Sequence, residues 1–223
     1  MLHKELLAIA EPALENVLDN PFWAGLRDGT LPTEALLHFV HQDSEHLLPA
    51  FARALARAGA AAPKDSQALL LGRSVVGSLE AATRLRARYE ELADELELPA
   101  LSAEPATVDP STHAYISSVT AATATSFPAG IAALLPMVWF NAKVSHDLVD
   151  RHKVGGRYDK WIEAYLPGHG YARTVQAFLD LVDEVGEDSS ESERALMMEQ
   201  FTISTRYEWV FAEAAWQQPV WPV

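Results

Sequence analysis

The stretch TEALLHFVHQDSEHLLPAF, residues 33–51, decides the secondary structure of the first half of the chain. Its apolar residues recur at spacings of three and four, the period of an amphipathic α-helix. The preceding Thr-Leu-Pro-Thr segment, residues 30–33, supplies hydroxyls and a proline suited to the start of a helix, after a turn at Gly29. We therefore expect a helix over about residues 33–59.

The polar residues of this stretch fall on different faces of the expected helix. At about 100° per residue, the apolar residues Leu36, Phe39, Val40, Leu47 and Ala50 all lie within about 60° of Asp43. Asp43 is therefore expected in the middle of the buried stripe. His41 and Glu45 lie about 160° away and are expected to form a solvated i,i+4 pair. His46 lies at the edge of the inner face.

Helical spacing recurs along almost all of the 223 residues, whereas alternating runs rich in Val, Ile and Thr are missing. The expected helices cover about residues 2–18, 33–59, 65–97, 112–125, 128–152, 157–165, 169–185 and 189–216. Neither half of the chain offers enough helix faces to close a core alone, so the irregular segment 98–112 is not a domain boundary. The fold class predicted is all-α, a single-domain up-and-down bundle of seven or eight helices over residues 1–223.

Composition excludes several function classes. The chain has 17 Lys and Arg against 31 Asp and Glu, a formal net charge of -14, and no segregated basic face, so we expect no nucleic-acid partner. It has eight His and no Cys, which excludes disulfides, cysteine-ligated metals and a thiolate nucleophile. We find no apolar run of about 18 residues and read the N-terminus as an amphipathic helix, so we expect no membrane span and a cytoplasmic protein.

A second carboxylate points inward in the expected last helix. The residues around Glu208 on its face are apolar: Met197, Phe201, Phe211, Ala212 and Ala215. A buried carboxylate must be paired, protonated or exposed to a polar cavity. Asp43 and Glu208 on separate helices therefore indicate a shared pocket inside the bundle. The alternative is that each pairs with a buried backbone group or with an inward-facing Arg or Tyr.

The segment ALLPMVWFNA, residues 133–142, places Met137 on the buried stripe of its helix. Methionine is a common filler of cores, so this position by itself indicates packing. The aromatic residues of the second half also favour core or interface packing, and among them Trp139 is expected nearest to the pocket. The tail WQQPVWPV, residues 216–223, carries two tryptophans that we expect to bury against a partner.

Five separated blocks resemble the TenA family, the thiaminase II or aminopyrimidine aminohydrolase proteins. They are NPFWAGLRDGTLPTEALLHFVHQDSEHL, Tyr115, ALLPMVWFNA, YDKWIEAY and STRYEWVFAEAAW. The resemblance implies a heme oxygenase-like fold, a homo-oligomer such as a tetramer, a small heterocyclic ligand of the aminopyrimidine type, and neither a cofactor nor a metal ion. It also implies that Asp43 hydrogen-bonds the pyrimidine ring, that Glu208 handles protons, and that Tyr115 and Tyr165 line the pocket.

Two positions depart from the family's pattern. Members that hydrolyse thiamin or deaminate the aminopyrimidine place a cysteine where this chain has Met137, and a thioether has no ionisable proton. His46 stands where a tyrosine or phenylalanine is usual and brings a group that exchanges protons near neutral pH. The resemblance thus implies thiamin-pyrimidine salvage by hydrolysis of a C–N bond without cysteine: Glu208 is acid and base, Asp43 anchors the ring, and His46 assists.

Two alternatives stay open. Loss of the nucleophile with retention of both carboxylates is also what a degenerate homologue would show, one that binds a heterocyclic ligand or acts indirectly in regulation. The heme oxygenase-like fold also hosts di-iron oxidases, and His146 and Asp150 have a suitable spacing. However, Lys153 occupies the third ligand position and His152 comes one residue early, a rotation of about 100°. His113, His146 and His169 are expected at the surface or at helix ends.

Overall fold

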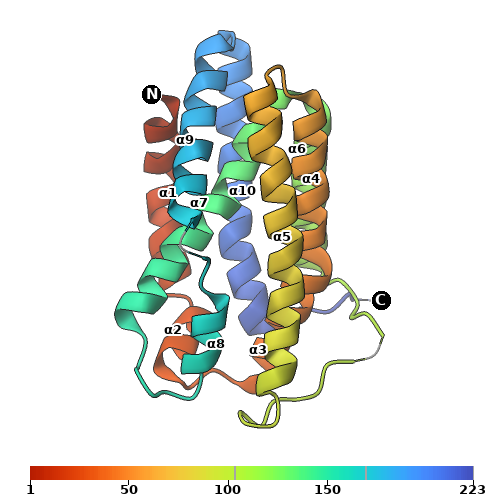
Figure 1. The fold of residues 1–223 in the computed structure, drawn as a ribbon, viewed down its shortest axis with the longest axis vertical. Coiled ribbons are helices and arrows are strands. Elements are labelled where there is room, and N and C mark those ends of the chain that lie inside the picture. Colours follow the sequence, from red (N-terminus) through yellow and green to blue (C-terminus); the bar gives the residue numbers. More distant parts are fainter. Residues whose placement is uncertain (103, 169, 223) are drawn as a thin grey trace.

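The computed structural model describes residues 1–102, 104–168 and 170–222, and over these ranges the chain forms helices and no β-strand. His169 lies outside the described residues. The elements are α1 (Leu2–Leu18), α2 (Pro21–Asp28), α3 (Thr33–His41), the π-helical turn η1 (Gln42–Leu47), α4 (Leu48–Ala61), α5 (Asp65–Leu92), α6 (Pro110–Thr125), α7 (Phe127–Arg151), α8 (Asp159–Tyr165), α9 (Tyr171–Asp188) and α10 (Glu191–Gln217). The long helices run side by side, and the short helices α2, α3 and α8 gather at one end (Figure 1).

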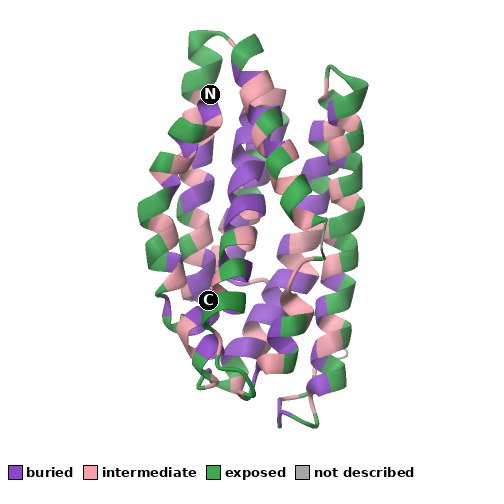
Figure 2. Cartoon of the chain, turned by 60° about the vertical axis from the view of Figure 1, so that its left-hand side comes forward, coloured by how far each residue is buried: buried purple, intermediate pink, exposed green. Residues whose placement is uncertain are grey.

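The buried apolar residues form one connected core, and the buried positions follow the inward faces of the helices (Figure 2). Helix α10 packs against α7, α1 and α6, while α4 packs along α5. Figure 1 shows α10 between α1 and α9 on one side and α4 and α5 on the other. Helix α10 is therefore surrounded by other helices, and its residue Glu208 lines the cavity between them.

Helix α2 is absent from the sequence prediction. It is capped by Asn20, whose side chain accepts a hydrogen bond from the N–H of Phe22 (2.9 Å), and Pro21 occupies its first turn. It ends at Gly29, whose φ of 77° confirms the predicted turn. An eight-residue helix has too few turns to show a clear helical period in the sequence. Its capping residues were therefore the one local signal from which it could have been predicted.

The helix predicted over residues 33–59 is instead divided by η1. Pro49 follows this turn, and a proline ring clashes with the carbonyl four residues before it in a regular α-helix. In η1 the N–H of Leu48 donates to the carbonyl of Asp43, five residues back, which widens the turn. Such π-turns are frequent at functional sites.

The segment 106–109 covers one face of η1. The amide of Gln42 donates to the carbonyl of Thr107 (3.0 Å) and accepts from the N–H of Asp109 (3.0 Å). The N–H of Ala106 donates to the Glu45 carboxylate (2.8 Å). These bonds hold η1 in one orientation and leave its other face to the bundle interior.

Two other expectations need adjustment. Helix α5 ends at Leu92 and not near residue 97. Contrary to our reading, α7 is long and apolar enough by length and composition to cross a membrane, but 67% of its most apolar window is buried in the bundle, the position of a core helix. In the tail, Trp221 donates from Nε1 to the carbonyl of Val108 (2.8 Å) and is 44% exposed, and its burial against a partner stays a prediction.

Candidate active site

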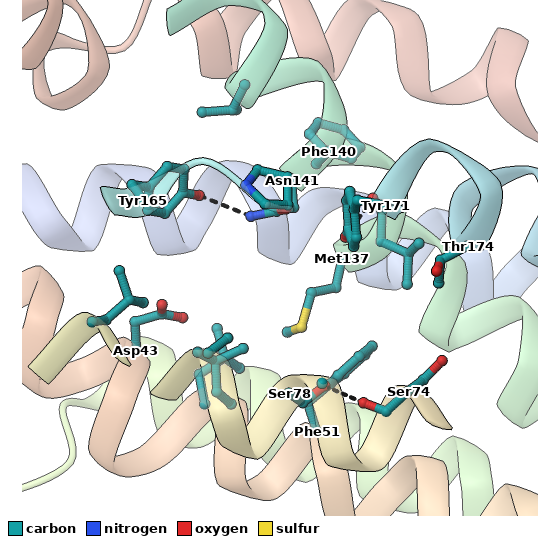
Figure 3. Close-up of a pocket in the computed structure, with 18 of the residues that line it drawn as sticks. Asp43, Phe51, Ser74, Ser78, Met137, Phe140, Asn141, Tyr165, Tyr171 and Thr174 are labelled. Atoms are coloured by element: carbon teal, nitrogen blue, oxygen red, sulfur yellow. Dashed lines mark hydrogen bonds between the residues drawn. The ribbon is translucent and has the colours of Figure 1, made fainter. Parts of the chain in front are cut away.

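A cavity of about 860 Å³ lies among η1, α5, α7, α9 and α10. In Figure 3, Asp43 lies at one end of the cavity, Met137 points its sulfur into the middle, and Ser74 and Thr174 lie at the other end. The exposed lining residues come from α5, the segment after α8 and the start of α9. The cavity therefore opens to solvent along that side and is closed around Asp43.

The closed end contains both carboxyl groups expected to point inward. Asp43 is 8% exposed, and burial raises the pKa of its carboxyl to about 7. Burial also raises the pKa of Glu208 to about 7; the hydrogen bond from Tyr115 lowers it part of the way, and charge on Asp43 raises it. The two carboxyl groups are therefore close enough to interact, and each exists in both protonation states near neutral pH.

Aromatic rings surround these carboxyl groups. Trp23, Phe39, Tyr165 and Phe211 line the cavity. The ring centroids of Trp23 and Tyr165 are 5.6 Å apart, and those of Phe39 and Phe211 are 5.7 Å apart. Such a wall matches a flat ring in shape, and it surrounds the carboxyl groups with apolar surface.

Tyr165 and Asn141 add polar groups to this wall. The Asn141 amide donates to the Tyr165 hydroxyl (3.1 Å), and Figure 3 shows both side chains on the same side of the cavity. The hydroxyl proton of Tyr165 remains able to donate, and the Asn141 carbonyl remains able to accept. Burial raises the pKa of the Tyr165 phenol well above its ordinary value, so this residue is a hydrogen-bond donor and not a base.

Tyr115 reaches the site through Glu208. It is 1% exposed and is not among the residues that line the cavity, but its hydroxyl donates to Glu208 Oε1. Its ring stacks on Tyr207, with centroids 5.3 Å apart and an interplanar angle of 10°. Tyr115 therefore holds the carboxyl group in place, a role different from the expected lining of the pocket.

Met137 lines the cavity, whereas Trp139 and His46 do not. Trp139 is buried against Phe140, and Lys143 lies over its ring with Nζ 5.3 Å from the ring centroid. His46 turns toward segment 106–109, where Nε2 lies 2.7 Å from the carbonyl oxygen of Ala106. The widened turn and this segment rotate His46 away from the expected position, so His46 does not face a ligand in the cavity.

His41 and Glu45 form the predicted pair, with Nδ1 3.0 Å from Oε1, but the pair is not solvated. His41 is 8% exposed, and Arg86 of α5 also pairs with Glu45. Burial by itself would raise the pKa of Glu45, but the N–H of Ala106, His41 and Arg86 together lower it. The face opposite Asp43 is thus buried as well, against another part of the chain.

Sequence reasoning missed Trp23, Phe39, Phe211 and Asn141 as lining residues. Phe39 and Phe211 lie one helical turn from Asp43 and Glu208, so the same helix geometry could have found them. Asn141 lies one turn after Met137 and could have been found in the same way. Trp23 belongs to the unpredicted helix α2 and gave no such signal.

Within the described ranges, no group of three or more His, Asp or Glu side chains lies close enough to hold a metal ion. His146 and Asp150 are exposed, as is His113. His152 is bonded elsewhere, with Nε2 2.8 Å from Asp159 and Nδ1 2.6 Å from the carbonyl of Leu148. The described residues therefore provide no set of ligands for the di-iron centre that was considered as an alternative.

The bundle of long helices around an interior cavity has the fold of TenA homologues of solved structure, which places it in the heme oxygenase-like class of helical proteins. Within that class, residues 8–218 match the model of the TENA/THI-4/PQQC family. The chain belongs to this family.

Two relatives of known name are similar in sequence. The aminopyrimidine aminohydrolase of Bacillus subtilis strain 168 is 32% identical over 205 residues, which cover 91% of this chain and 84% of that protein. The thiamine biosynthesis multifunctional protein ThiED of Corynebacterium efficiens is 31% identical over 166 residues, 74% of this chain and 21% of that longer protein.

Solved structures agree on the fold. The TenA homologue from P. horikoshii OT3 superposes with a TM-score of 0.79 at 24% identity, covering 97% of this chain and 99% of its own. A TenA family transcription regulator from Silicibacter sp. TM1040 superposes with a TM-score of 0.75 at 26% identity, covering 96% of both chains.

Proposed function

We propose that this protein acts in thiamin-pyrimidine salvage and hydrolyses a C–N bond of an aminopyrimidine or a related compound without a cysteine nucleophile. The sequence relatives named for aminopyrimidine hydrolysis and thiamine biosynthesis support this proposal. The observation that carries it is the presence of Asp43 and Glu208, each with a pKa raised to about 7, in one aromatic cavity.

In the proposed complex the pyrimidine ring lies between the aromatic side chains at the closed end. A carboxyl group with a pKa of about 7, such as that of Asp43, can donate a proton to a ring nitrogen or accept a hydrogen bond from an amino group. Tyr165 and Asn141 offer a further donor and acceptor. These contacts would orient the ring against Glu208, as positioning of reactants requires.

Glu208 then acts as base and acid. Its carboxylate removes a proton from water, the water oxygen bonds to the ring carbon that carries the amino group, and the proton passes to the departing nitrogen. The C–O bond forms, the C–N bond breaks, and ammonia leaves. A group with a pKa of about 7 suits both transfers at neutral pH. Tyr115 keeps Glu208 in the orientation that this step needs.

The first test is a ligand panel. The purified protein is heated with millimolar 4-amino-5-aminomethyl-2-methylpyrimidine, its hydroxymethyl analogue or thiamin, and any stabilising compound is then assayed for ammonia release. Stabilisation with ammonia release is the expected result. If none of the three shifts the melting temperature or is consumed, the proposal is wrong.

Met137 gives a second test, because the chain contains no cysteine. Wild-type turnover should resist thiol-alkylating reagents. Met137→Cys puts a thiol in the cavity, and its turnover should become sensitive to the same reagents. Turnover of Met137→Cys that resists the reagents as well as the wild type would contradict the placement of residue 137 beside the bound substrate.

A second candidate function is ligand binding without chemistry, with any regulatory effect being indirect. The thioether of Met137 in the middle of the cavity favours it, because this side chain supplies no nucleophile. Stabilisation by a pyrimidine without consumption over hours would select this candidate.

We further propose that the protein is a cytoplasmic homo-oligomer, such as a tetramer, that binds neither nucleic acid nor membranes. The net charge of -14 supports the lack of a nucleic-acid partner. Light scattering on the purified protein tests the assembly, and the mass of a single chain at micromolar concentration would contradict it.

A further inference from the structure

The cavity is longer than one pyrimidine ring. Its volume of about 860 Å³ lies near the upper end of the roughly 300–1,000 Å³ common for small-molecule sites. Its lining on α5 runs from Leu70 to Leu85, which at 1.5 Å per residue spans about 22 Å. A ring held between Asp43 and Glu208 would occupy the closed end and leave the remainder of the groove free.

The open side of the cavity carries positive charge. Arg73 and Arg84 of α5 and Arg173 of α9 line it, and within the described part of the chain none of the three forms an ion pair or donates a side-chain hydrogen bond. Other arginines are paired, for example Arg27 with Asp147. Glu80 is the acidic residue that lines the same side. Arg194 and Arg206 are likewise exposed and without such an interaction in the described ranges, but they do not line this cavity. What distinguishes Arg73, Arg84 and Arg173 is that they gather on one side of one cavity in a chain whose formal net charge is -14.

The path between the two ends is polar and open. Ser74 and Ser78 donate their hydroxyl protons to backbone carbonyls of α5 (3.0 and 2.9 Å), which leaves their oxygens as acceptors. Thr174 faces them across the cavity (Figure 3). Gly77 lies on the same lining, and a Cβ atom at this position would meet nothing within 4 Å. A chain of several atoms can therefore lie against this part of α5.

We propose that the natural ligand is an aminopyrimidine with an extended substituent that ends in an anionic group, a carboxylate or a phosphate, held by Arg73 and Arg173 at the open side. Guanidinium groups bind both anions through paired hydrogen bonds. This inference rests on the proposed function for the position of the ring, and it adds the substrate class.

The test compares matched ligands by titration calorimetry. The 5-aminomethyl group of the pyrimidine is acylated with acetic, succinic or adipic acid, and each diacid product is paired with its neutral terminal methyl amide. The phosphate ester of the hydroxymethyl analogue, paired with its methyl ether, forms a separate arm. We expect an anionic ligand to bind about tenfold more tightly than its neutral partner. The carboxylate and phosphate arms identify which anion is preferred, and added salt should reduce the difference.

Variants locate the effect. Arg73→Ala/Arg173→Ala should reduce the tenfold preference to less than about twofold, with binding of the acetyl compound unchanged. Arg53→Ala is the control, because Arg53 is exposed on α4 and lies outside the cavity lining. Gly77→Leu should weaken the adipoyl ligand and spare the acetyl one. Gly72→Leu on the same helix also meets open space but lies away from the cavity, so it should change neither.

The acetyl compound carries no anion and therefore tests the proposed function by itself. If it binds while every charged ligand binds no better than its neutral partner, the anionic substituent is wrong and the proposed function stands. If anionic preference persists unchanged in Arg73→Ala/Arg173→Ala, the assigned arginines are wrong. Failure of all the pyrimidines to bind would overturn the proposed function, and this inference with it.

Discussion

Asp43 and Glu45 lie two residues apart in the same π-helical turn, yet their surroundings move their pKa values in opposite directions. Asp43 faces the cavity, and burial raises its pKa to about 7. Glu45 faces Arg86, His41 and the N–H of Ala106, and together these lower its pKa although burial opposes them. The first carboxyl group therefore lacks compensation in the free protein, and the second is fully paired.

The difference distinguishes a buried carboxylate that stabilises the fold from a buried carboxyl group that is available for function. A paired carboxylate such as Glu45 joins η1 to α5 and to segment 106–109. An unpaired carboxyl group is destabilising at neutral pH, and such groups cluster at functional sites. Glu208 belongs with Asp43 in this comparison, because no cationic side chain among the described residues pairs with it and burial raises its pKa as well.

The largest expected effect is on turnover. Glu208→Gln removes the proposed base and acid and should lower kcat about 10²–10⁴-fold on any substrate found, as for other general acid–base residues. Glu199→Gln is the control, because Glu199 is exposed on the same helix α10. Turnover in Glu208→Gln equal to that in the control would exclude the proposed role.

The next effect concerns the paired carboxylate. Glu45→Ala leaves the N–H of Ala106 and the side chains of His41 and Arg86 without their partner. We expect a loss of about 2–3 kcal/mol in the free energy of unfolding, measured by urea denaturation at pH 7. A neutral result would mean that this face of η1 is held by packing alone.

Asp43→Asn should raise the free energy of unfolding, whereas Glu45→Ala should lower it. The folded-state pKa of Asp43 is raised above the unfolded value, so ionisation destabilises the fold progressively as pH rises from about 4 to about 7. Three pKa units correspond to about 4 kcal/mol, but a buried amide also lacks partners, so we expect a net gain of about 1–2 kcal/mol at pH 8. The gain should disappear near pH 4. Denaturation at both values tests this, and a loss of stability at pH 8 would refute it.

The smallest effect is expected for Tyr115→Phe. The hydrogen bond from Tyr115 lowers the pKa of Glu208, so its removal raises that pKa further. Because the base must be deprotonated, the acid limb of the pH profile of kcat should move to higher pH by on the order of half a unit. Tyr207→Phe keeps the stacked ring and is the control. Equal profiles would show that Tyr115 serves packing only.

The sequence was informative wherever a property repeats with the helical period. The 100° rotation per residue placed Asp43 and Glu208 on buried faces, and the structure brings both to one cavity. The same period found the long helices within a few residues of their ends, apart from α5, and the resemblance of five blocks agrees with the family match over residues 8–218.

The positions of individual residues relative to the cavity were predicted less well where the backbone departs from a regular α-helix. Trp139 and His46 were expected in the pocket and lie outside its lining. For His46 the reason is the π-turn before Pro49, which changes the rotation per residue that the prediction assumed constant. Trp23 could not be found, since it lies on a short helix whose own existence was not predicted.

The sequence by itself determined the helical class, the absence of a thiol and the presence of two inward carboxyl groups, because these depend on composition and on local periodicity. Only the tertiary structure decided which carboxyl group has a partner. Glu45 meets Arg86 and Ala106, which are 41 and 61 residues away in the chain, and the cavity's open side combines arginines from α5 and α9. Helical period governs which face a residue occupies, whereas the packing of distant helices governs what that face meets.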